Sequence, residues 1–216
     1  MNEWLPYEPG AAVYAEAGVD DAEWRQRQRE RFVRWFSGKT IADLGCGPGF
    51  DCAAFASLGF QTIGVDGSPA MLELCGKHSP TTRRQCQDLR EPLPEKVDGI
   101  WSMFSLLHLP PEDLAGCLDH WGDSLISGGI LAVGTAASGR LKQRDVPGWL
   151  GIQTAVCRFY YHPSEFLSEL LTSAGFEILE SHHETPAPYR GGVYEENQLS
   201  AYVIFARLAD RARALA

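Results

Sequence analysis

Short apolar runs alternate with amphipathic stretches along most of the chain, and this alternation predicts the elements of an α/β fold. Runs that are rich in apolar side chains and bounded by glycine, proline or polar residues are typical of buried strands. The predicted strands cover residues 40–44, 61–65, 83–87, 97–103, 129–133, 176–181 and 199–207. The third is the weakest, because its sequence is Arg-Arg-Gln-Cys-Gln.

The stretches between these runs follow the period of a helix. Within residues 20–36, the aromatic side chains can share one face while the arginines point elsewhere. Ser68 and Pro69 indicate a helix start, because serine is a favoured N-cap and proline suits the first helical position. Further helices are predicted over residues 50–58, 111–125 and 163–174.

Strands that alternate with helices imply parallel βαβ units in a sheet that helices cover on both faces. We therefore predict a doubly wound α/β fold with a mostly parallel, seven-stranded sheet. The last two predicted strands follow each other without a helix between them. They are expected to form an antiparallel hairpin at the C-terminal edge of the sheet.

The length of 216 residues is typical of one compact domain, so residues 1–216 are predicted to form a single unit. Within it, residues 1–38 are expected to be a helical lid region. The connections 134–161 and 182–198 are longer than ordinary loops, which indicates substrate-side loops or, alternatively, solvated surface loops. Of the six tryptophans, only Trp149 lies in a connection where it could touch a substrate.

The charge pattern argues against a nucleic-acid surface. The formal net charge is -9, and the basic residues gather mostly in two short stretches, 25–34 and 207–213, rather than in a broad stripe. We interpret the first stretch as the solvated face of a helix. No apolar run approaches the roughly 20 residues that span a bilayer, and the N-terminus does not resemble a basic, then apolar, leader. We therefore expect a cytoplasmic protein with neither nucleic-acid nor membrane partners.

The six cysteines are scattered along the chain. They form no C-x-x-C pair and have no neighbouring histidine at metal-ligand spacing. This pattern predicts reduced, mostly buried thiols, with neither a disulfide framework nor a metal site.

The segment with the clearest chemistry is the loop Asp43-Leu44-Gly45-Cys46-Gly47-Pro48-Gly49, which follows the first predicted strand. Glycines there let the backbone pass close beside a ligand. Asp66 ends the next strand, where a carboxylate can accept hydrogen bonds from both hydroxyls of a ribose. The dinucleotide pattern G-x-G-x-x-G fails, because Phe50 stands where its third glycine belongs. A carboxylate at Asp43 would also repel a pyrophosphate and suit a cationic ligand.

This acid-x-G-x-G-x-G loop resembles the first motif of the class I S-adenosylmethionine-dependent methyltransferases. The likeness extends over residues 39–207 and implies that family's Rossmann-like fold. It implies S-adenosyl-L-methionine as cofactor and S-adenosyl-L-homocysteine as product. The cofactor-binding residues that the resemblance implies are Tyr14, Asp43, Gly45, Cys46, Gly47, Gly49, Asp66, Gly67, Ser68, Asp88, Leu89 and Phe104.

The resemblance also implies a role for each part of this set. The glycine loop would lie along the methionine portion of the cofactor, with Asp43 at its amino end. Asp66 would hold the ribose hydroxyls, and Gly67 and Ser68 would lie near the adenine. The carboxylate of Asp88 would accept a hydrogen bond from the adenine amino group. Tyr7 and Tyr14 resemble a paired-tyrosine lead that often closes over the cofactor, and Tyr14 is the member assigned to cofactor binding.

The resemblance further implies transfer of a methyl group to an O, N, S or C atom of a small molecule, a metabolite or natural product, rather than to a nucleobase. Enzymes that methylate exocyclic base amines carry an Asn/Asp-Pro-Pro-aromatic motif after the fourth strand, where this chain has Ser-Met-Phe-Ser at 102–105. His108 follows this strand and is the leading candidate for a general base, although it could instead shape the pocket. Tyr160 and His162 are further catalytic candidates, with packing as their alternative role.

Two other functions remain open at this point. The chain could be an S-adenosylmethionine-binding module without catalysis, or a nicotinamide-dependent oxidoreductase on a similar sheet. The sequence carries no signal for the identity of the acceptor, the atom methylated or the oligomeric state.

Overall fold

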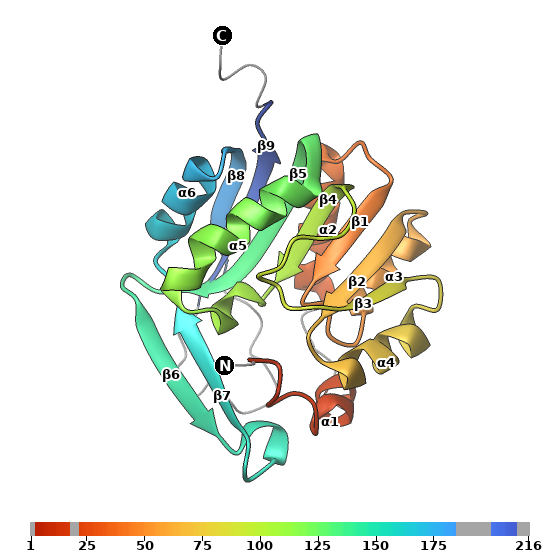
Figure 1. Cartoon of the computed structure of the whole chain (residues 1–216), viewed down its shortest axis with the longest axis vertical. Helices are drawn as coiled ribbons and strands as arrows, with labels where there is room; N and C mark the ends of the chain where they lie inside the picture. Colours follow the sequence, from red (N-terminus) through yellow and green to blue (C-terminus); the bar gives the residue numbers. More distant parts are fainter. Residues whose placement is uncertain (1–2, 18–21, 185–199, 211–216) are drawn as a thin grey trace.

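The computed structural model of the chain describes residues 3–17, 22–184 and 200–210, and it contains the predicted doubly wound sheet (Figure 1). The strands follow the order β3-β2-β1-β4-β5-β9-β8. The first five in chain order pair in parallel, whereas β9 is antiparallel to both of its neighbours. The strand bounds are β1 (Thr40–Leu44), β2 (Gln61–Asp66), β3 (Arg83–Cys86), β4 (Val97–Met103), β5 (Leu125–Ala137), β8 (Phe176–Glu184) and β9 (Ser200–Leu208).

Helices cover both faces of this sheet, as Figure 1 shows. One apolar cluster joins the sheet to α5 and α6 and contains the buried side chain of Trp121. A second cluster joins the other face to α2 and α3 and contains Trp101. The helix bounds are α1 (Ala11–Glu16), α2 (Ala22–Trp35), α3 (Phe50–Ser57), α4 (Pro69–His78), α5 (Pro111–Ser124) and α6 (Ser164–Ser173).

Local signals account for several of these boundaries. Ser68 caps α4 as predicted, because its hydroxyl accepts a hydrogen bond from the Met71 amide at 3.1 Å, and Pro69 is the first helical residue. The antiparallel C-terminal hairpin is also confirmed. However, β9 inserts between β5 and β8, so β8 forms the edge of the sheet.

The connection 134–161 is not an irregular loop, which corrects the prediction. Strand β5 continues to Ala137, and β6 (Lys142–Pro147) and β7 (Val156–Tyr161) then form a separate antiparallel pair. A short 3-10 turn, η2 (Trp149–Gly151), lies between them. Along β7, buried and more exposed side chains alternate, which is the period-two signal of a strand with one covered face.

The second long connection also begins later than predicted, because β8 extends to Glu184. Residues 185–199 of that prediction lie outside the described residues. Among the helices that the structure does describe, none is long and apolar enough to cross a membrane.

Candidate functional site

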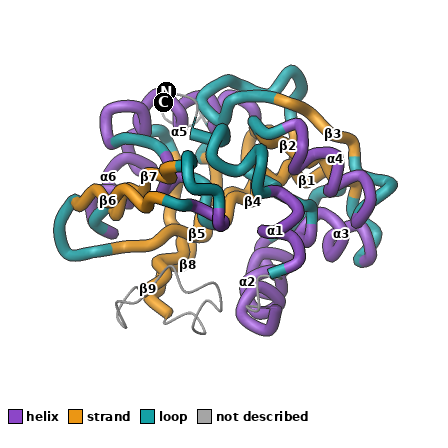
Figure 2. Tube along the Cα trace, turned by 90° about the horizontal axis from the view of Figure 1, so that it is seen from below, coloured by secondary structure: helices purple, strands orange, loops and turns teal. Residues whose placement is uncertain are grey.

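A cleft of about 950 Å³, partly open to solvent, lies at the carboxyl ends of the parallel strands. The strand order reverses between β1 and β4, and ligands of doubly wound folds bind at such a switch point. Seen from below in Figure 2, loops gather at this edge between the β6–β7 hairpin and α4. Of the residues predicted from the sequence, the following line the cleft: Tyr14, Asp43, Gly45, Cys46, Gly47, Asp66, Gly67, Asp88, Leu89, Phe104 and His108.

The glycine loop needs its three glycines for different reasons, although all three have positive φ angles. A β-carbon on Gly45 would collide with the Ser105 side chain, and one on Gly49 would lie 2.5 Å from the sulfur of Cys75. These two glycines therefore permit close packing. Beside Gly47, a β-carbon would meet only the Tyr14 ring, at 3.9 Å. Gly47 consequently keeps open the part of the cleft where a ligand can approach the backbone.

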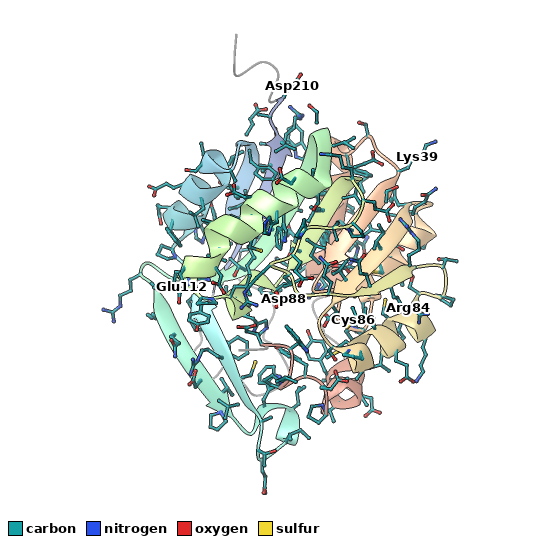
Figure 3. The ribbon with its side chains drawn as sticks, viewed as in Figure 1. Lys39, Arg84, Cys86, Asp88, Glu112 and Asp210 are labelled. Carbon is teal, nitrogen blue, oxygen red and sulfur yellow. The ribbon has the colours of Figure 1, made fainter. Side chains whose placement is uncertain are left out.

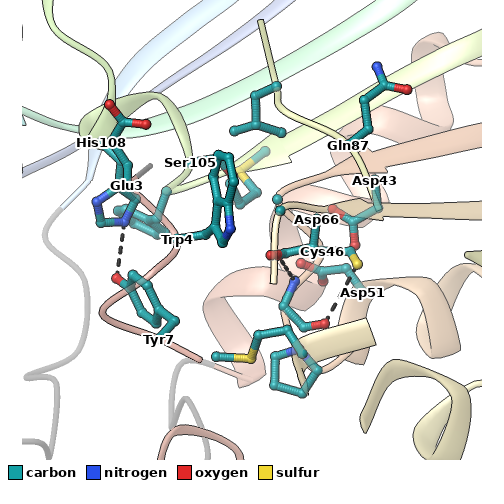
Figure 4. A pocket seen from close by; sticks show the side chains of 18 of the residues that line it. Glu3, Trp4, Tyr7, Asp43, Cys46, Asp51, Asp66, Gln87, Ser105 and His108 are labelled. Carbon is teal, nitrogen blue, oxygen red and sulfur yellow. Dashed lines mark hydrogen bonds between the residues drawn. The ribbon is translucent and has the colours of Figure 1, made fainter. Parts of the chain in front are cut away.

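Asp66, at the end of β2, holds this loop and faces the cleft (Figure 4). One carboxylate oxygen accepts a hydrogen bond from the Gly47 amide at 2.9 Å, and the other accepts one from the Ser68 amide at 2.9 Å. Burial raises the pKa of Asp66 to about 6, although these two hydrogen bonds oppose the shift. Each oxygen retains accepting capacity, so the carboxylate can also receive hydroxyl donors from a diol.

Asp43, at the end of β1, is a buried acid whose environment favours a cationic ligand. Burial and then the neighbouring Asp51 raise its pKa well above the usual range, and the thiol of Cys52 donates a hydrogen bond to it at 3.4 Å. A positive group bound beside Asp43 would stabilise the ionised carboxylate. The residue type and position therefore suit an amino group rather than a phosphate.

Asp88 lies at the rim of the cleft beyond β3, as Figure 3 shows. Its carboxylate pairs with Arg90 at 2.9 Å. The same guanidinium contacts Glu3 and Asp113, each at 2.7 Å. Arg90 thereby links Glu3 to the side of the cleft where the resemblance places the adenine.

The N-terminal segment, residues 3–16, lies over the cleft and supplies residues that the sequence analysis missed. The indole of Trp4 packs so closely against Gly67 that a β-carbon there would overlap it. Glu3, Trp4 and Tyr7 line the cleft (Figure 4). Further along this segment, the carboxylate of Glu8 accepts hydrogen bonds from the Ser68 hydroxyl and, at 3.3 Å, from the Ala70 amide. Only the paired tyrosines hinted at this arrangement.

His108, at the end of the turn η1 (Leu106–His108), has both ring nitrogens engaged. Its Nδ1 lies 3.2 Å from the carbonyl oxygen of Arg158, so Nδ1 carries the proton and donates it. Nε2 then accepts a hydrogen bond from the Tyr7 hydroxyl at 3.0 Å. Burial lowers the pKa of His108 to about 4, so the ring is neutral at neutral pH.

Four predicted residues lie outside the lining of the cleft. Gly49 packs on α4, and Ser68 caps that helix. His162 is fully buried, and its Nε2 lies 3.1 Å from the carbonyl oxygen of Leu109, while the Tyr160 ring stacks near it on the outer side of β7. The geometry therefore favours the packing alternative for both of these catalytic candidates.

Trp149 also does not line the described cleft. It is buried, with its ring centroid 5.5 Å from that of Tyr7 and 5.2 Å from that of Phe159. It therefore packs against Tyr7, and Trp4 rather than Trp149 lines the cleft.

The arginine run of α2 is a solvated face only in part, which corrects that interpretation: Arg27 is 54% exposed, whereas Arg25 and Arg29 turn inward. Arg25 and Arg29 are only 15% and 16% exposed, and both pair with the buried carboxylate of Asp51. The Trp101 indole donates a third hydrogen bond to Asp51 at 3.0 Å. Burial opposes ionisation of Asp51, but the two arginines outweigh it and lower its pKa. The Arg25 guanidinium also lies 6.0 Å from the ring centroid of Phe104, at the cleft.

A doubly wound sheet with an acid, an open glycine loop and a second acid at its switch point defines a site for a nucleoside-containing cofactor. Comparison with protein families assigns residues 41–129 to the methyltransferase domain family. This match covers the glycine loop and the central strands, and it agrees with the resemblance to the class I S-adenosylmethionine-dependent methyltransferases. This assignment favours the methyltransferase interpretation over a nicotinamide-dependent oxidoreductase.

Individual relatives support the same class. Ubiquinone biosynthesis O-methyltransferase of a Bradyrhizobium species is 28% identical over 123 residues, which are 54% of this chain and 48% of that protein. The chain spans about half the length of the first curated relatives it matches.

Solved structures share the fold. A methyltransferase of Methanosarcina mazei superposes with a TM-score of 0.70 at 15% identity, covering 82% of this chain and 95% of that one. The 1,6-didemethyltoxoflavin-N1-methyltransferase of Burkholderia thailandensis, with bound S-adenosylhomocysteine, has a TM-score of 0.61 at 20% identity and covers 95% and 79%.

Proposed function

We propose that this chain transfers a methyl group from S-adenosylmethionine to an oxygen or nitrogen atom of a small organic molecule. The observation that carries the proposal is the arrangement of Asp43, Gly47 and Asp66 around one cleft at the switch point of the sheet. The names of the relatives, an O-methyltransferase and an N1-methyltransferase, support an oxygen or nitrogen acceptor.

The cleft residues match successive parts of the cofactor from its amino end to its adenine. Asp43 suits the amino end, and the space beside Gly47 suits the methionine chain. Asp66 has the accepting capacity for the ribose hydroxyls, and Asp88 and Leu89 border the adenine side. When bound, S-adenosylmethionine supplies an activated methyl group on a positively charged sulfur.

The protein's own part in methyl transfer is to place the acceptor in line and to exclude water. Phe104, Tyr7 and His108 line the cleft beyond the glycine loop and form the acceptor side in this proposal. His108 acts here as a positioning residue, because its neutral ring accepts a hydrogen bond from the Tyr7 hydroxyl and holds that hydroxyl in place at the cleft. A ring with a pKa near 4 is a poor general base for a phenol or an amine.

Residues 1–38 serve as the lid in this proposal. Residues 1–216 form a single unit, and its β6–β7 hairpin is the wall of the cleft on the acceptor side. The contacts of Glu3 with Arg90 and of Glu8 with Ser68 support the lid role, because they fasten the segment to the rest of the chain at two points. The packing of Phe159 beside His108, with ring centroids 5.1 Å apart, supports the wall. The net charge of -9 supports a small acceptor over nucleic acid, and the six free thiols support a reducing, cytoplasmic compartment.

The test is calorimetric titration of the purified chain with S-adenosylhomocysteine, with NAD in a parallel titration. Micromolar binding of S-adenosylhomocysteine alone is expected, whereas binding of NAD alone or of neither ligand would overturn the cofactor assignment. Labelled methyl transfer from S-adenosylmethionine to a panel of phenols and heterocyclic amines then tests catalysis. Binding of S-adenosylhomocysteine without methyl transfer to any of these compounds or to added nucleic acid would favour the non-catalytic module.

A further inference from the structure

Three buried cysteines from separate parts of the chain converge beneath the glycine loop. Cys46 belongs to that loop, Cys52 to α3 and Cys75 to α4. Their sulfur atoms all lie within 4.8 Å of one another, and the thiols are free. The spacing of these residues along the chain does not indicate a cluster. They come together only because α3 and α4 pack against β2.

The three sulfurs gather beside Gly64 of β2, where any side chain would meet all of them. A β-carbon on Gly64 would lie 3.0 Å from the sulfur of Cys46, 3.2 Å from that of Cys75 and 3.3 Å from that of Cys52. Thiolates bound to one zinc ion at about 2.3 Å lie roughly 3.8 Å apart in tetrahedral geometry. The observed separations therefore need only a small inward movement to reach ligand geometry.

The ligand set selects the kind of ion. Three sulfur ligands favour thiophilic cations such as Zn²⁺, Cd²⁺ and Cu⁺ over Mg²⁺ or Ca²⁺, which prefer oxygen. Asp43 accepts a hydrogen bond from Cys52 and adds negative charge beside the cluster. A cation there would offset the cost of placing thiolates and a carboxylate together in a buried region.

We propose that Cys46, Cys52 and Cys75 form a binding site for one thiophilic divalent cation, with Zn²⁺ as the ion expected in the cell. Cys46 lines the cleft, which provides the entry path for the ion. Because Cys46 lies within the glycine loop, the bound ion would fasten this loop to α3 and α4. The proposal stands independently of the acceptor and of methyl transfer.

The first experiment titrates the reduced full chain with Cd²⁺ in chelator-free buffer and follows the charge-transfer absorbance of cadmium thiolates. We expect saturation at one Cd²⁺ per chain and displacement of the signal by Zn²⁺. Cys46→Ala, Cys52→Ala and Cys75→Ala should each weaken binding by about tenfold or more. Cys86→Ala and Cys117→Ala are the matched controls, one exposed and one buried outside the cluster, and should bind as the unmodified chain does.

Thermal unfolding without metal shows which variants keep the fold, and Zn²⁺ should raise the melting temperature of the unmodified chain but not of a folded Cys75→Ala variant. X-ray absorption of the one-to-one zinc complex of the unmodified chain supplies a readout that needs no variant. Three sulfur ligands near about 2.3 Å are expected. A shell dominated by oxygen or nitrogen, no stoichiometric binding, or equal loss in the Cys86→Ala control would overturn the proposal.

Discussion

The hydroxyl of Tyr7 lies 3.0 Å from Nε2 of His108, and this hydrogen bond joins the N-terminal segment to the turn that follows β4. Because His108 Nδ1 faces the carbonyl oxygen of Arg158, the bond also reaches the β6–β7 hairpin. One contact thus connects three parts of the chain at the acceptor side of the cleft.

Replacing His108 with glutamine should reduce turnover by less than tenfold, because the amide can still accept a hydrogen bond from Tyr7. Tyr7→Phe should lower kcat/KM for the acceptor by about threefold to tenfold, because the ring loses the one hydrogen bond to His108 that fixes it on the acceptor side, and it should leave the affinity for S-adenosylhomocysteine unchanged. Steady-state kinetics and calorimetry measure both effects. A loss of turnover of two or more orders of magnitude in His108→Gln, without a matching loss of affinity, would instead identify His108 as the general base.

Gly47→Ala should weaken binding of S-adenosylhomocysteine by about 1–3 kcal/mol, because the methyl group would enter the space beside the loop. Gly59→Ala is the matched control, since Gly59 also has a positive φ angle and its β-carbon would meet nothing within 4 Å. Both variants should lose stability through backbone strain, but only the first should lose affinity. Equal affinities in the two variants would place the ligand elsewhere.

Affinity for S-adenosylhomocysteine should depend on pH through Asp66. The ribose hydroxyls need the ionised carboxylate as acceptor, and burial raises the pKa of Asp66 to about 6. Affinity should therefore be full well above pH 6, about half of its full value near pH 6, and should fall by up to about tenfold per pH unit at lower pH. Calorimetry across this range measures the effect. Asp66→Asn should bind weakly with little pH dependence, and an unchanged profile in this variant would contradict the assignment.

Asp51→Asn should lower the free energy of unfolding by about 3 kcal/mol, because it leaves two half-buried arginines without their carboxylate. The native pKa of Asp51 is lowered, so its stabilising contribution is complete above the unfolded-state pKa and is lost as the pH falls below the native value. Denaturant unfolding at neutral and acidic pH measures both effects.

Asp145→Asn provides the comparison, because Asp145 pairs with Arg158 on the exposed surface at 2.7 Å. Surface pairs contribute little, so this variant should unfold as the unmodified chain does. An equally large loss in both variants would show that the burial of Asp51 is not the cause.

The sequence by itself determined the alternation of strands and helices, and with it the doubly wound sheet. Local periodicity and caps carry this information, as at Ser68 and Pro69. It also determined that Asp43, Gly47 and Asp66 would share one edge, because the carboxyl ends of adjacent parallel strands lie together. The same reasoning could have predicted the β6–β7 hairpin, since the alternating side chains of β7 follow the period of a strand.

Only the tertiary structure decided which distant residues complete the site. Glu3 meets Arg90, and Trp4 covers Gly67, because the N-terminal segment folds back over the cleft. The convergence of Cys46, Cys52 and Cys75 likewise depends on how α3 and α4 dock on β2. Such contacts join residues far apart in the chain, and the packing of whole elements sets them rather than any local pattern of side chains.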